Sequence, residues 1–140
     1  MDSKIFIKTP FTLGKNERLK SRKLIELLFK EGKSFAIFPV RVYQLETEEL
    51  SVSLQAGFTA SSRSFKKAVD RNRIKRVMRE AYRLQKHPLN TLLEHKNKKL
   101  CLFFIYTGRE LPDTAEIKEK INLILNRVMS TLDEATPSNS

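Results

Sequence analysis

Residues 65–86 read FKKAVDRNRIKRVMREAYRLQK, and their apolar positions recur at the three- and four-residue spacing of an amphipathic helix. On a helical projection that sets Arg71 to zero, the apolar side chains fall between about 220° and 340°. They form one stripe made of Ile74, Val77, Met78, Ala81 and Leu84. This pattern predicts a long helix that packs the stripe on a core and turns its other side to solvent.

The side of this helix away from the stripe is strongly basic. Five cations and one amide fall between about 0° and 140°, with Tyr82 near the edge of the arc. We call this set the basic face, and it consists of Arg71, Asn72, Lys75, Arg76, Arg79 and Arg83. Like charges four residues apart destabilise a helix, whereas a row of phosphates would turn that repulsion into binding. The basic face therefore predicts a polyanionic partner, but it does not separate RNA from DNA.

The overall charge also favours nucleic acid. The chain has 27 Lys and Arg residues against 16 Asp and Glu, a formal net charge of +11 and a pI near 10.0. Residues 62–86 alone carry ten basic and two acidic side chains, more than a merely solvated surface needs. An anionic membrane is disfavoured as the partner, because the apolar stripe is a compact core face rather than an aromatic insertion surface.

Length and composition indicate one domain over residues 1–140, with an extended arm at 1–15 and a frayed tail at 135–140. No apolar run approaches the ~20 residues that a membrane-spanning helix needs. The first residues contain no signal-peptide core, and Cys101 is the only cysteine, which fits a reducing compartment. These features together predict a cytoplasmic protein.

The remaining segments predict an α+β fold. Ser21–Lys30 has a helical apolar face, and Gly32 follows where a left-handed cap would end that helix. Residues 39–46, 51–60 and 99–107 have strand patterns, and the last is apolar enough to be covered on both faces. Asp113 and Glu116 form the capping box of a final helix. The order is a helix, two or three strands, the basic helix, a strand and a helix.

The segments around the basic helix give weaker expectations. We expect one serine among residues 61–64 to cap its N-terminus. His87 precedes Pro88 and looks like a helix terminus, whereas His95 is placed in a polar loop. Neither histidine has an evident catalytic partner, and the glutamates at 46–49 read as a solvated turn. We therefore predict no catalytic residue and no metal site in this chain.

A possible surface for a single strand lies on the segment 39–46. Alternate residues of a strand share a face, so Arg41 and Tyr43 would present a cation and a ring together. Such a pairing suits a single-stranded nucleic acid, which binds through stacking and positive charge. Phe29, at the end of the first helix, is close in sequence to that strand. From the residues alone, Phe29 is more readily interpreted as a core side chain, and Tyr43 is equally compatible with either interpretation.

The run from Arg71 to Glu80, RNRIKRVMRE, closely resembles the signature helix of the bacterial ribonuclease P protein component. Weaker similarities occur at Arg18-Leu19, at FKEGKS over 29–34, at 57–59 and at 66–68. The resemblance implies a two-layer αβββαβα sandwich of the ribosomal protein S5 domain 2-like kind, with a left-handed βαβ crossover.

The resemblance also implies a function. The family's protein binds a catalytic RNA and the 5′ leader of precursor tRNA, and it assists the Mg²⁺-dependent endonucleolytic removal of that leader. The magnesium is held mainly by the RNA subunit, and the expected partners are that RNA and precursor tRNA, without a membrane or DNA. The alternative is a stand-alone basic RNA-binding or ribosome-associated protein without a nuclease role.

The resemblance assigns residues to two surfaces. Those implied to face the catalytic RNA are Arg71, Asn72, Arg73, Lys75, Arg76 and Arg79, and we add Arg83 and the nearby Arg63, Lys66 and Lys67 as RNA-binding residues. The implied leader cleft holds Phe29 and Tyr43, and we add Arg41 from the same strand face.

Overall fold

The computed structural model describes residues 14–135, so residues 1–13 of the arm expected over 1–15 and residues 136–140 of the tail expected over 135–140 lie outside the described residues. A short 3₁₀ turn, η1 (Lys15–Glu17), precedes α1 (Arg22–Glu31). Three strands follow, β1 (Lys33–Ile37), β2 (Val40–Glu46) and β3 (Leu54–Ala60). The chain continues through α2 (Ala68–Gln85), α3 (His87–Lys96), β4 (Leu100–Tyr106) and α4 (Thr114–Ala135).

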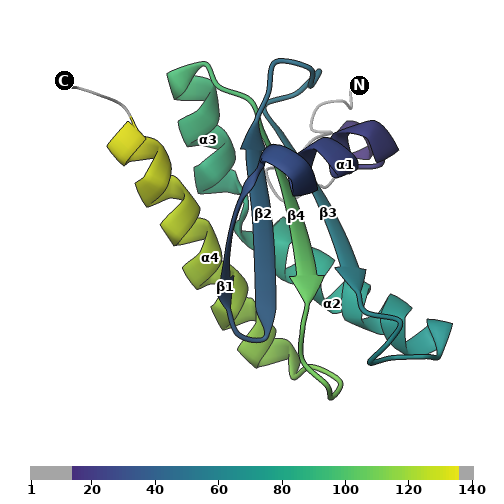
Figure 1. Cartoon of the computed structure of the whole chain (residues 1–140). Helices are drawn as coiled ribbons and strands as arrows, with labels where there is room; N and C mark the ends of the chain where they lie inside the picture. The colour runs from purple at the N-terminus through teal and green to yellow at the C-terminus, as the bar shows by residue number, and fades with distance from the viewer. Residues whose placement is uncertain (1–13, 136–140) are drawn as a thin grey trace, which may run out of the picture.

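The strands form one sheet in the order β1-β2-β4-β3 (Figure 1). β2 pairs antiparallel with β1 and with β4, whereas β3 and β4 run parallel. In this register Tyr43 and Gly57 are both partners of Phe103 on the central strand β4. The sheet therefore brings β2 and β3, which the sequence predicts as separate strands, to either side of β4.

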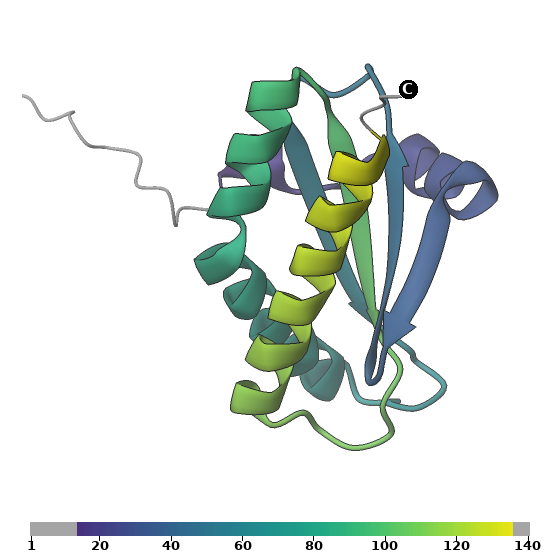
Figure 2. The same cartoon turned by 90° about the vertical axis from the view of Figure 1, so that its left-hand side faces the viewer.

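Helices cover the two faces of the sheet unequally. α2, α3 and α4 lie on one face, which we call the inner face, and α1 crosses part of the other, the outer face (Figures 1 and 2). The resemblance implies two layers and a single helix between β3 and β4. The structure differs on both counts, since α1 adds a partial third layer and α3 makes the order αβββααβα.

The core has two parts, one on each face of the sheet. The larger part joins the inner face to α2, α3 and α4 and includes the fully buried Ile74, Met78 and Phe104. The smaller part lies under α1 and consists of Leu19, Leu24, Leu28, Leu50 and Cys101. Leu24 and Leu28 are the side chains that α1 contributes to this cluster, and burial of a leucine contributes about 1.5–3 kcal/mol to its attachment to the sheet.

The predicted starts of the first and last helices are confirmed. The Ser21 hydroxyl accepts a hydrogen bond from the Leu24 N–H at 3.2 Å, and the Asp113 carboxylate accepts one from the Glu116 N–H at 3.2 Å. The left-handed cap predicted at Gly32 is wrong, because its φ is −75°. Glycine is required there for space, since a Cβ would lie 2.5 Å from the carbonyl oxygen of Leu28.

α2 is confirmed as a long amphipathic helix, but its buried face is rotated from the predicted stripe. Tyr82, placed at the edge of the basic face, is fully buried, whereas Leu84 is 41% exposed. The buried residues Ile74, Met78, Ala81 and Tyr82 centre about 40° from the predicted stripe. The physical reason is the tyrosine ring, which packs against Phe58 and Phe104 of the sheet.

Two expectations beside α2 are wrong. No serine caps it, because the N-cap position is Lys67, and Ser61 instead accepts a hydrogen bond from the Arg63 N–H within the preceding turn. His87 lies at a helix terminus as expected, as the first residue of α3, whereas His95 lies in the last turn of that helix rather than in a loop. Proline at position 88 is compatible with this helix start, because the first turn does not need its missing N–H.

Candidate nucleic-acid interface

The basic face of α2 is open to solvent only in part. Asn72 and Arg76 are exposed, as is Arg73, whereas Lys75 and Arg79 are partly buried. This difference follows from the rotation of the helix, which turns positions 75 and 79 toward the edge of the sheet. The structure therefore places Arg73 and Arg76 at the centre of the solvent-facing side.

Two cations of the basic face are occupied within the protein. The Arg71 guanidinium donates hydrogen bonds to the carbonyl oxygens of Phe65 and Lys66, at 2.7 and 2.9 Å. Arg83 binds the Glu80 carboxylate with two hydrogen bonds, at 2.8 and 3.1 Å. The hydrogen bond from Arg83 holds the pKa of Glu80 below its usual value, and the charges of Arg83 and Arg79 act in the same direction. Arg71 thus fixes the turn before α2.

The connection that precedes α2 continues the positive surface. Arg63, Lys66 and Lys67 are all exposed there, between the end of β3 and the start of the helix. Since Arg71 holds the carbonyls of Phe65 and Lys66, the basic connection is tied to the basic face.

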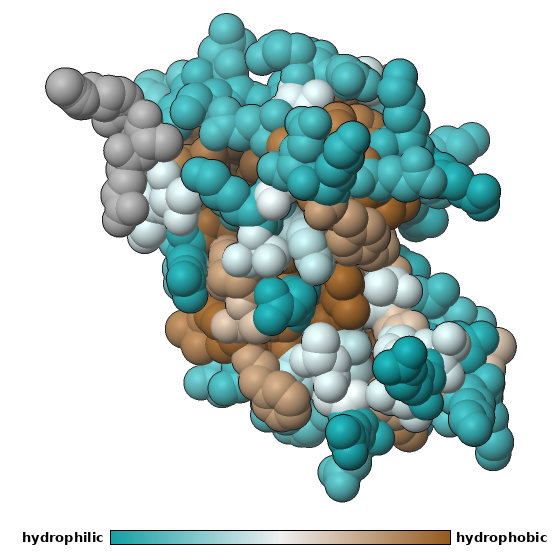
Figure 3. Space-filling view, viewed as in Figure 1, coloured by the Kyte–Doolittle hydropathy of each residue, from teal (hydrophilic) through white to brown (hydrophobic). Residues whose placement is uncertain are grey.

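The outer face of the sheet carries a cluster of three aromatic rings. The ring of Phe29 lies 4.7 Å from that of Tyr43 and 5.5 Å from that of Phe103, and both contacts are edge-to-face. We call Phe29, Tyr43 and Phe103 the ring cluster. Phe29 is 44% exposed, so it is not the core residue that the sequence alone favours. Figure 3 shows apolar surface gathered on this face of the sheet below the hydrophilic side chains of α1.

Arg41 lies on the same sheet face as the ring cluster. It is two residues from Tyr43 on β2 and pairs in register with Ile105 of β4. Its guanidinium donates one hydrogen bond, at 3.3 Å, to the Ser34 hydroxyl of the neighbouring strand β1. The structure therefore brings together the three predicted cleft residues, Phe29, Arg41 and Tyr43.

Phe103 is a cleft residue that the sequence interpretation missed. Residues 99–107 are apolar at nearly every position, which predicts a strand covered on both faces. In the structure Phe103 and Ile105 are only partly buried, because α1 covers a limited part of the outer face. The sequence feature that could have indicated Phe103 is the alternation of side chains along a strand. It places residues 101, 103 and 105 of β4 on the same sheet face as Tyr43.

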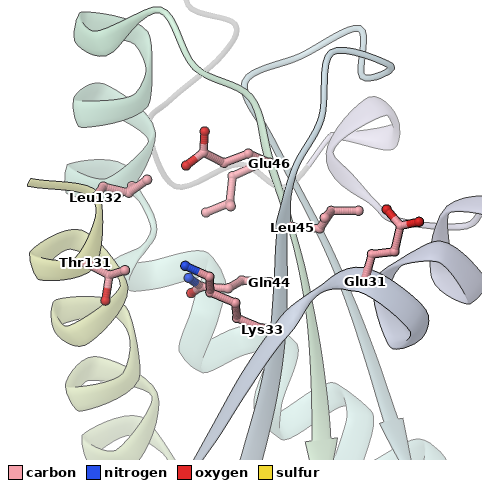
Figure 4. Close-up of a pocket in the computed structure, with 8 residues that line it drawn as sticks. Glu31, Lys33, Gln44, Leu45, Glu46, Thr131 and Leu132 are labelled. Carbon is pink, nitrogen blue, oxygen red and sulfur yellow. The ribbon is translucent and has the colours of Figure 1, made fainter. Parts of the chain in front are cut away.

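A separate pocket, near the β1 edge of the sheet, differs from the basic surface in its charge. It lies between β1, β2 and the end of α4 (Figure 4) and is lined by Glu31, Lys33, Gln44, Leu45, Glu46, Leu100, Thr131 and Leu132. Its charges are mixed, with Glu46 in an ion pair to Lys98 at 3.8 Å. A polyanion would meet two carboxylates there, so we do not include this pocket in the interface.

Other reactive groups have ordinary structural roles. Burial raises the pKa of the Cys101 thiol to about 11, and the thiol contacts the carbonyl oxygen of Leu45 at 3.6 Å, which makes it unreactive at neutral pH. Within residues 14–135, His, Cys, Asp and Glu side chains form no group of three suited to a metal ion. In that same range, no helix is sufficiently long and apolar to cross a membrane.

A basic helix and connection beside an aromatic, partly open sheet face define a class, namely a small α+β protein with a surface suited to nucleic acid. Comparison with known proteins then specifies the family. The family model described as Ribonuclease P matches residues 13–129, and the chain belongs to this family. The predicted resemblance is therefore confirmed.

Curated relatives have the same family name, and their alignments with this chain cover most of their length. The ribonuclease P protein component of Porphyromonas gingivalis ATCC 33277 is 35% identical over 130 residues, which cover 92% of this chain and 95% of the relative. The ribonuclease P protein component of Chlorobium phaeobacteroides is 29% identical over 128 residues, or 84% of this chain and 88% of the relative.

Solved structures agree in fold. The RNase P protein of Thermotoga maritima aligns with a TM-score of 0.59 at 27% identity, over 79% of this chain and 96% of its own. The RNase P protein of Staphylococcus aureus aligns with a TM-score of 0.62 at 23% identity, over 80% of this chain and 94% of its own, and supports the fold alone. The chain is thus similar to ribonuclease P protein components of a tRNA-processing ribonuclease.

Proposed function

We propose that this protein binds the catalytic RNA of ribonuclease P through the basic face of α2 and receives the 5′ leader of precursor tRNA on the outer face of its sheet. It thereby assists the Mg²⁺-dependent endonucleolytic removal of the leader. The observation that carries this proposal is the ring cluster of Phe29, Tyr43 and Phe103, which lies beside Arg41 on a partly uncovered sheet face.

The ring cluster suits an unpaired strand because every base offers a face for stacking. Stacking of a base on an aromatic side chain contributes about 1–3 kcal/mol and tolerates any sequence. Phe29 exposes 44% of its surface, and Tyr43 and Phe103 are partly exposed next to it. Arg41 supplies a positive charge for the backbone phosphate of the same strand.

The solvent-facing side of α2 suits the backbone of a folded RNA. Arg73 and Arg76 are exposed guanidinium groups one turn apart, with the exposed amide of Asn72 beside them. Arginine binds phosphate oxygens in a bidentate manner, and an amide is both donor and acceptor for a ribose or a base edge. Arg63, Lys66 and Lys67 extend this contact along the connection before the helix.

The catalytic magnesium ions belong mainly to the RNA subunit in this proposal. When bound there, they activate the attacking water and stabilise the leaving oxygen. The residues of this chain supply affinity and orientation: the basic face neutralises phosphates, and the ring cluster positions the leader. We place this work in the cytoplasm, with the chain acting as a single RNA-binding domain.

We further propose that the crossover from β3 to β4 is left-handed, as in the ribosomal protein S5 domain 2-like fold. Support comes from the arrangement of these parallel strands in Figure 1, where both point downward, β4 lies to the left of β3, and α2 and α3 join them behind the sheet. A right-handed connection with the helices on that side would place β4 to the right of β3. Most such connections are right-handed, so an experimental structure with a right-handed connection would contradict this point.

Binding of precursor and mature tRNA to the holoenzyme tests the leader assignment. Tyr43→Ala and Phe29→Ala should each weaken precursor binding by about 1–3 kcal/mol and leave mature tRNA binding nearly unchanged. Phe38→Ala is the matched control, because Phe38 is 71% exposed but lies outside the ring cluster. Equal losses for the two tRNAs would remove the leader assignment and favour the alternative of a general RNA-binding protein.

A further inference from the structure

A second cationic feature lies at the outer edge of β3, where two segments distant in sequence meet. A groove of about 190 Å³ runs between the stretch after η1 and the helix α2. Its lining contains four cations, two from each segment: Arg18, Lys20, Lys75 and Arg79. We call this the edge groove. Arg18 and Lys20 were not among the RNA-binding residues predicted from the sequence.

Within residues 14–135, no ion pair or hydrogen bond engages the side chains of the four cations of the edge groove. The two nearest acids in sequence are already engaged. Glu17 pairs with Lys86 at 2.6 Å, and Glu80 pairs with Arg83 at 2.8 Å. The groove thus concentrates positive charge that no ion pair among the described residues neutralises.

The segment that carries Arg18 and Lys20 is held in place by several contacts. The Leu19 N–H donates to the carbonyl oxygen of Ala56 on β3 at 2.9 Å, and the Gln55 amide donates to the carbonyl oxygen of Asn16 at 2.8 Å. At the far end of α2, Lys86 is buried with 4% exposure and pairs with Glu17. These contacts fix the backbone that carries the two cations next to α2 before any ligand binds, which lowers the entropic cost of ordering this segment on binding.

Between the two cationic segments the edge groove is lined by Ala56, Gly57 and Phe58 of β3. A Cβ added at Gly57 would lie 2.7 Å from the Phe103 ring and 3.3 Å from the carbonyl oxygen of Leu19. Phe103 belongs to the ring cluster, so the groove adjoins that cluster on one side. On the other side, Lys75 and Arg79 belong to the basic face.

We propose that the edge groove binds a backbone phosphate of RNA, with Arg18 and Lys20 as contacts that α2 alone does not provide. This inference rests on the proposed function, because RNA is the polyanion that the function supplies. Guanidinium and ammonium groups from two sides surround the anion, and their mutual repulsion is relieved when it binds. The bound phosphate lies between the strand on the ring cluster and the RNA on α2.

The test removes the two new cations and leaves the basic face intact. In Arg18→Gln/Lys20→Gln, RNA binding should weaken, and the slope of log K against log salt should become shallower by roughly 0.7–0.9 for one lost phosphate contact. Lys23→Gln/Lys118→Gln removes the same charge from exposed lysines outside the groove and should leave the slope unchanged. Circular dichroism and the melting temperature verify the fold of each variant.

Three RNA ligands identify the source of the phosphate. A loss confined to the isolated catalytic RNA assigns it to that subunit. A loss seen with precursor but not with mature tRNA in the holoenzyme assigns it to the leader. An Arg18→Gln/Lys20→Gln protein that binds all three with the wild-type slope overturns the proposal. If Arg76→Gln still weakens binding in that case, the proposed function stands; if it does not, the proposed function fails as well.

A double-mutant cycle tests whether both segments hold the same anion. The losses of affinity for Arg18→Gln and Arg79→Gln should not multiply, and we expect the double variant to differ from their product by roughly threefold or more. Losses that multiply to within experimental error would show that the two cations bind separately, which contradicts a shared phosphate in the edge groove.

Discussion

Two buried tyrosines differ in whether their hydroxyl group makes a hydrogen bond. This difference predicts opposite effects of replacing each tyrosine by phenylalanine on the free energy of unfolding. Tyr82 is fully buried on α2, and its hydroxyl oxygen has no hydrogen-bond partner among the described residues. Tyr106 is 4% exposed at the end of β4, and its hydroxyl donates to the carbonyl oxygen of Glu110 at 2.6 Å. Tyr82→Phe should stabilise the protein, whereas Tyr106→Phe should destabilise it.

The magnitudes follow from the cost of an unmade hydrogen bond. A buried polar group without a partner costs about 1–3 kcal/mol, and a made hydrogen bond contributes about 0.5–1.5 kcal/mol. Tyr82→Phe removes the penalty of the unpartnered hydroxyl but also loses the packing contacts of one oxygen atom. We therefore expect it to raise the free energy of unfolding by about 1 kcal/mol. Tyr106→Phe should lower it by about 1 kcal/mol, so the two variants should differ by about 2 kcal/mol.

Urea unfolding of wild type and both variants at pH 7, followed by circular dichroism, measures this difference. The corresponding melting temperatures should move about 3 °C in opposite directions. A fall of 1 kcal/mol or more for Tyr82→Phe would refute the reasoning, because it would show that the Tyr82 hydroxyl makes a stabilising hydrogen bond.

The same tyrosine gives a pH dependence. Burial, with a smaller effect of the Glu17 charge, raises the pKa of Tyr82 well above its ordinary value. Above about pH 10 the unfolded chain loses this proton while the folded chain keeps it, so the free energy of unfolding falls as pH rises. Tyr82→Phe should remove this component, and its stability advantage over wild type should therefore grow between pH 9 and pH 11.

Three further substitutions test the site. Gly57→Ala should displace the Phe103 ring, which would lie 2.7 Å from the new Cβ, and should weaken precursor tRNA binding more than mature tRNA binding in a side-by-side titration. Lys86→Met leaves the Glu17 carboxylate without its ion-pair partner and should lower the free energy of unfolding by about 2–3 kcal/mol in urea titrations. This loss is smaller than that for breaking a fully buried ion pair, because the Glu17 side chain is 23% exposed. An unchanged unfolding midpoint would contradict this prediction. Glu80→Gln removes a negative charge from α2 and should tighten RNA binding at low salt, with little change in stability because the Glu80–Arg83 ion pair is exposed.

Local signals in the sequence were sufficient for several elements. The cap at Asp113 was predicted because a carboxylate three residues before a free N–H is a short-range feature, whereas for the first helix the apolar spacing predicted the extent but not the Ser21 cap. The basic character of α2 was predicted because helical spacing alone sets which residues share a side. The pairing of Phe29 with Tyr43 came only with the family resemblance, since nothing local relates α1 to β2.

Features that depend on tertiary packing were missed. The rotation of α2 follows from Tyr82, whose polar hydroxyl favours a surface position although its ring contacts Phe58 and Phe104. α3 was missed because the residues after the terminus at His87 were interpreted as a polar loop, whereas Pro88 lies in the first turn of a further helix. The edge groove joins residues more than 50 positions apart, so no pattern within one segment could reveal it.

Cleavage of precursor tRNA by the cognate RNA subunit at low magnesium, with and without this protein, tests the central claim most directly. The account predicts that 5′-matured tRNA accumulates under these conditions only when the protein is present, and that Tyr43→Ala reduces this stimulation. Cleavage that is equally slow with and without the protein, while tight RNA binding persists, would contradict the account and leave a basic RNA-binding protein with the family's fold.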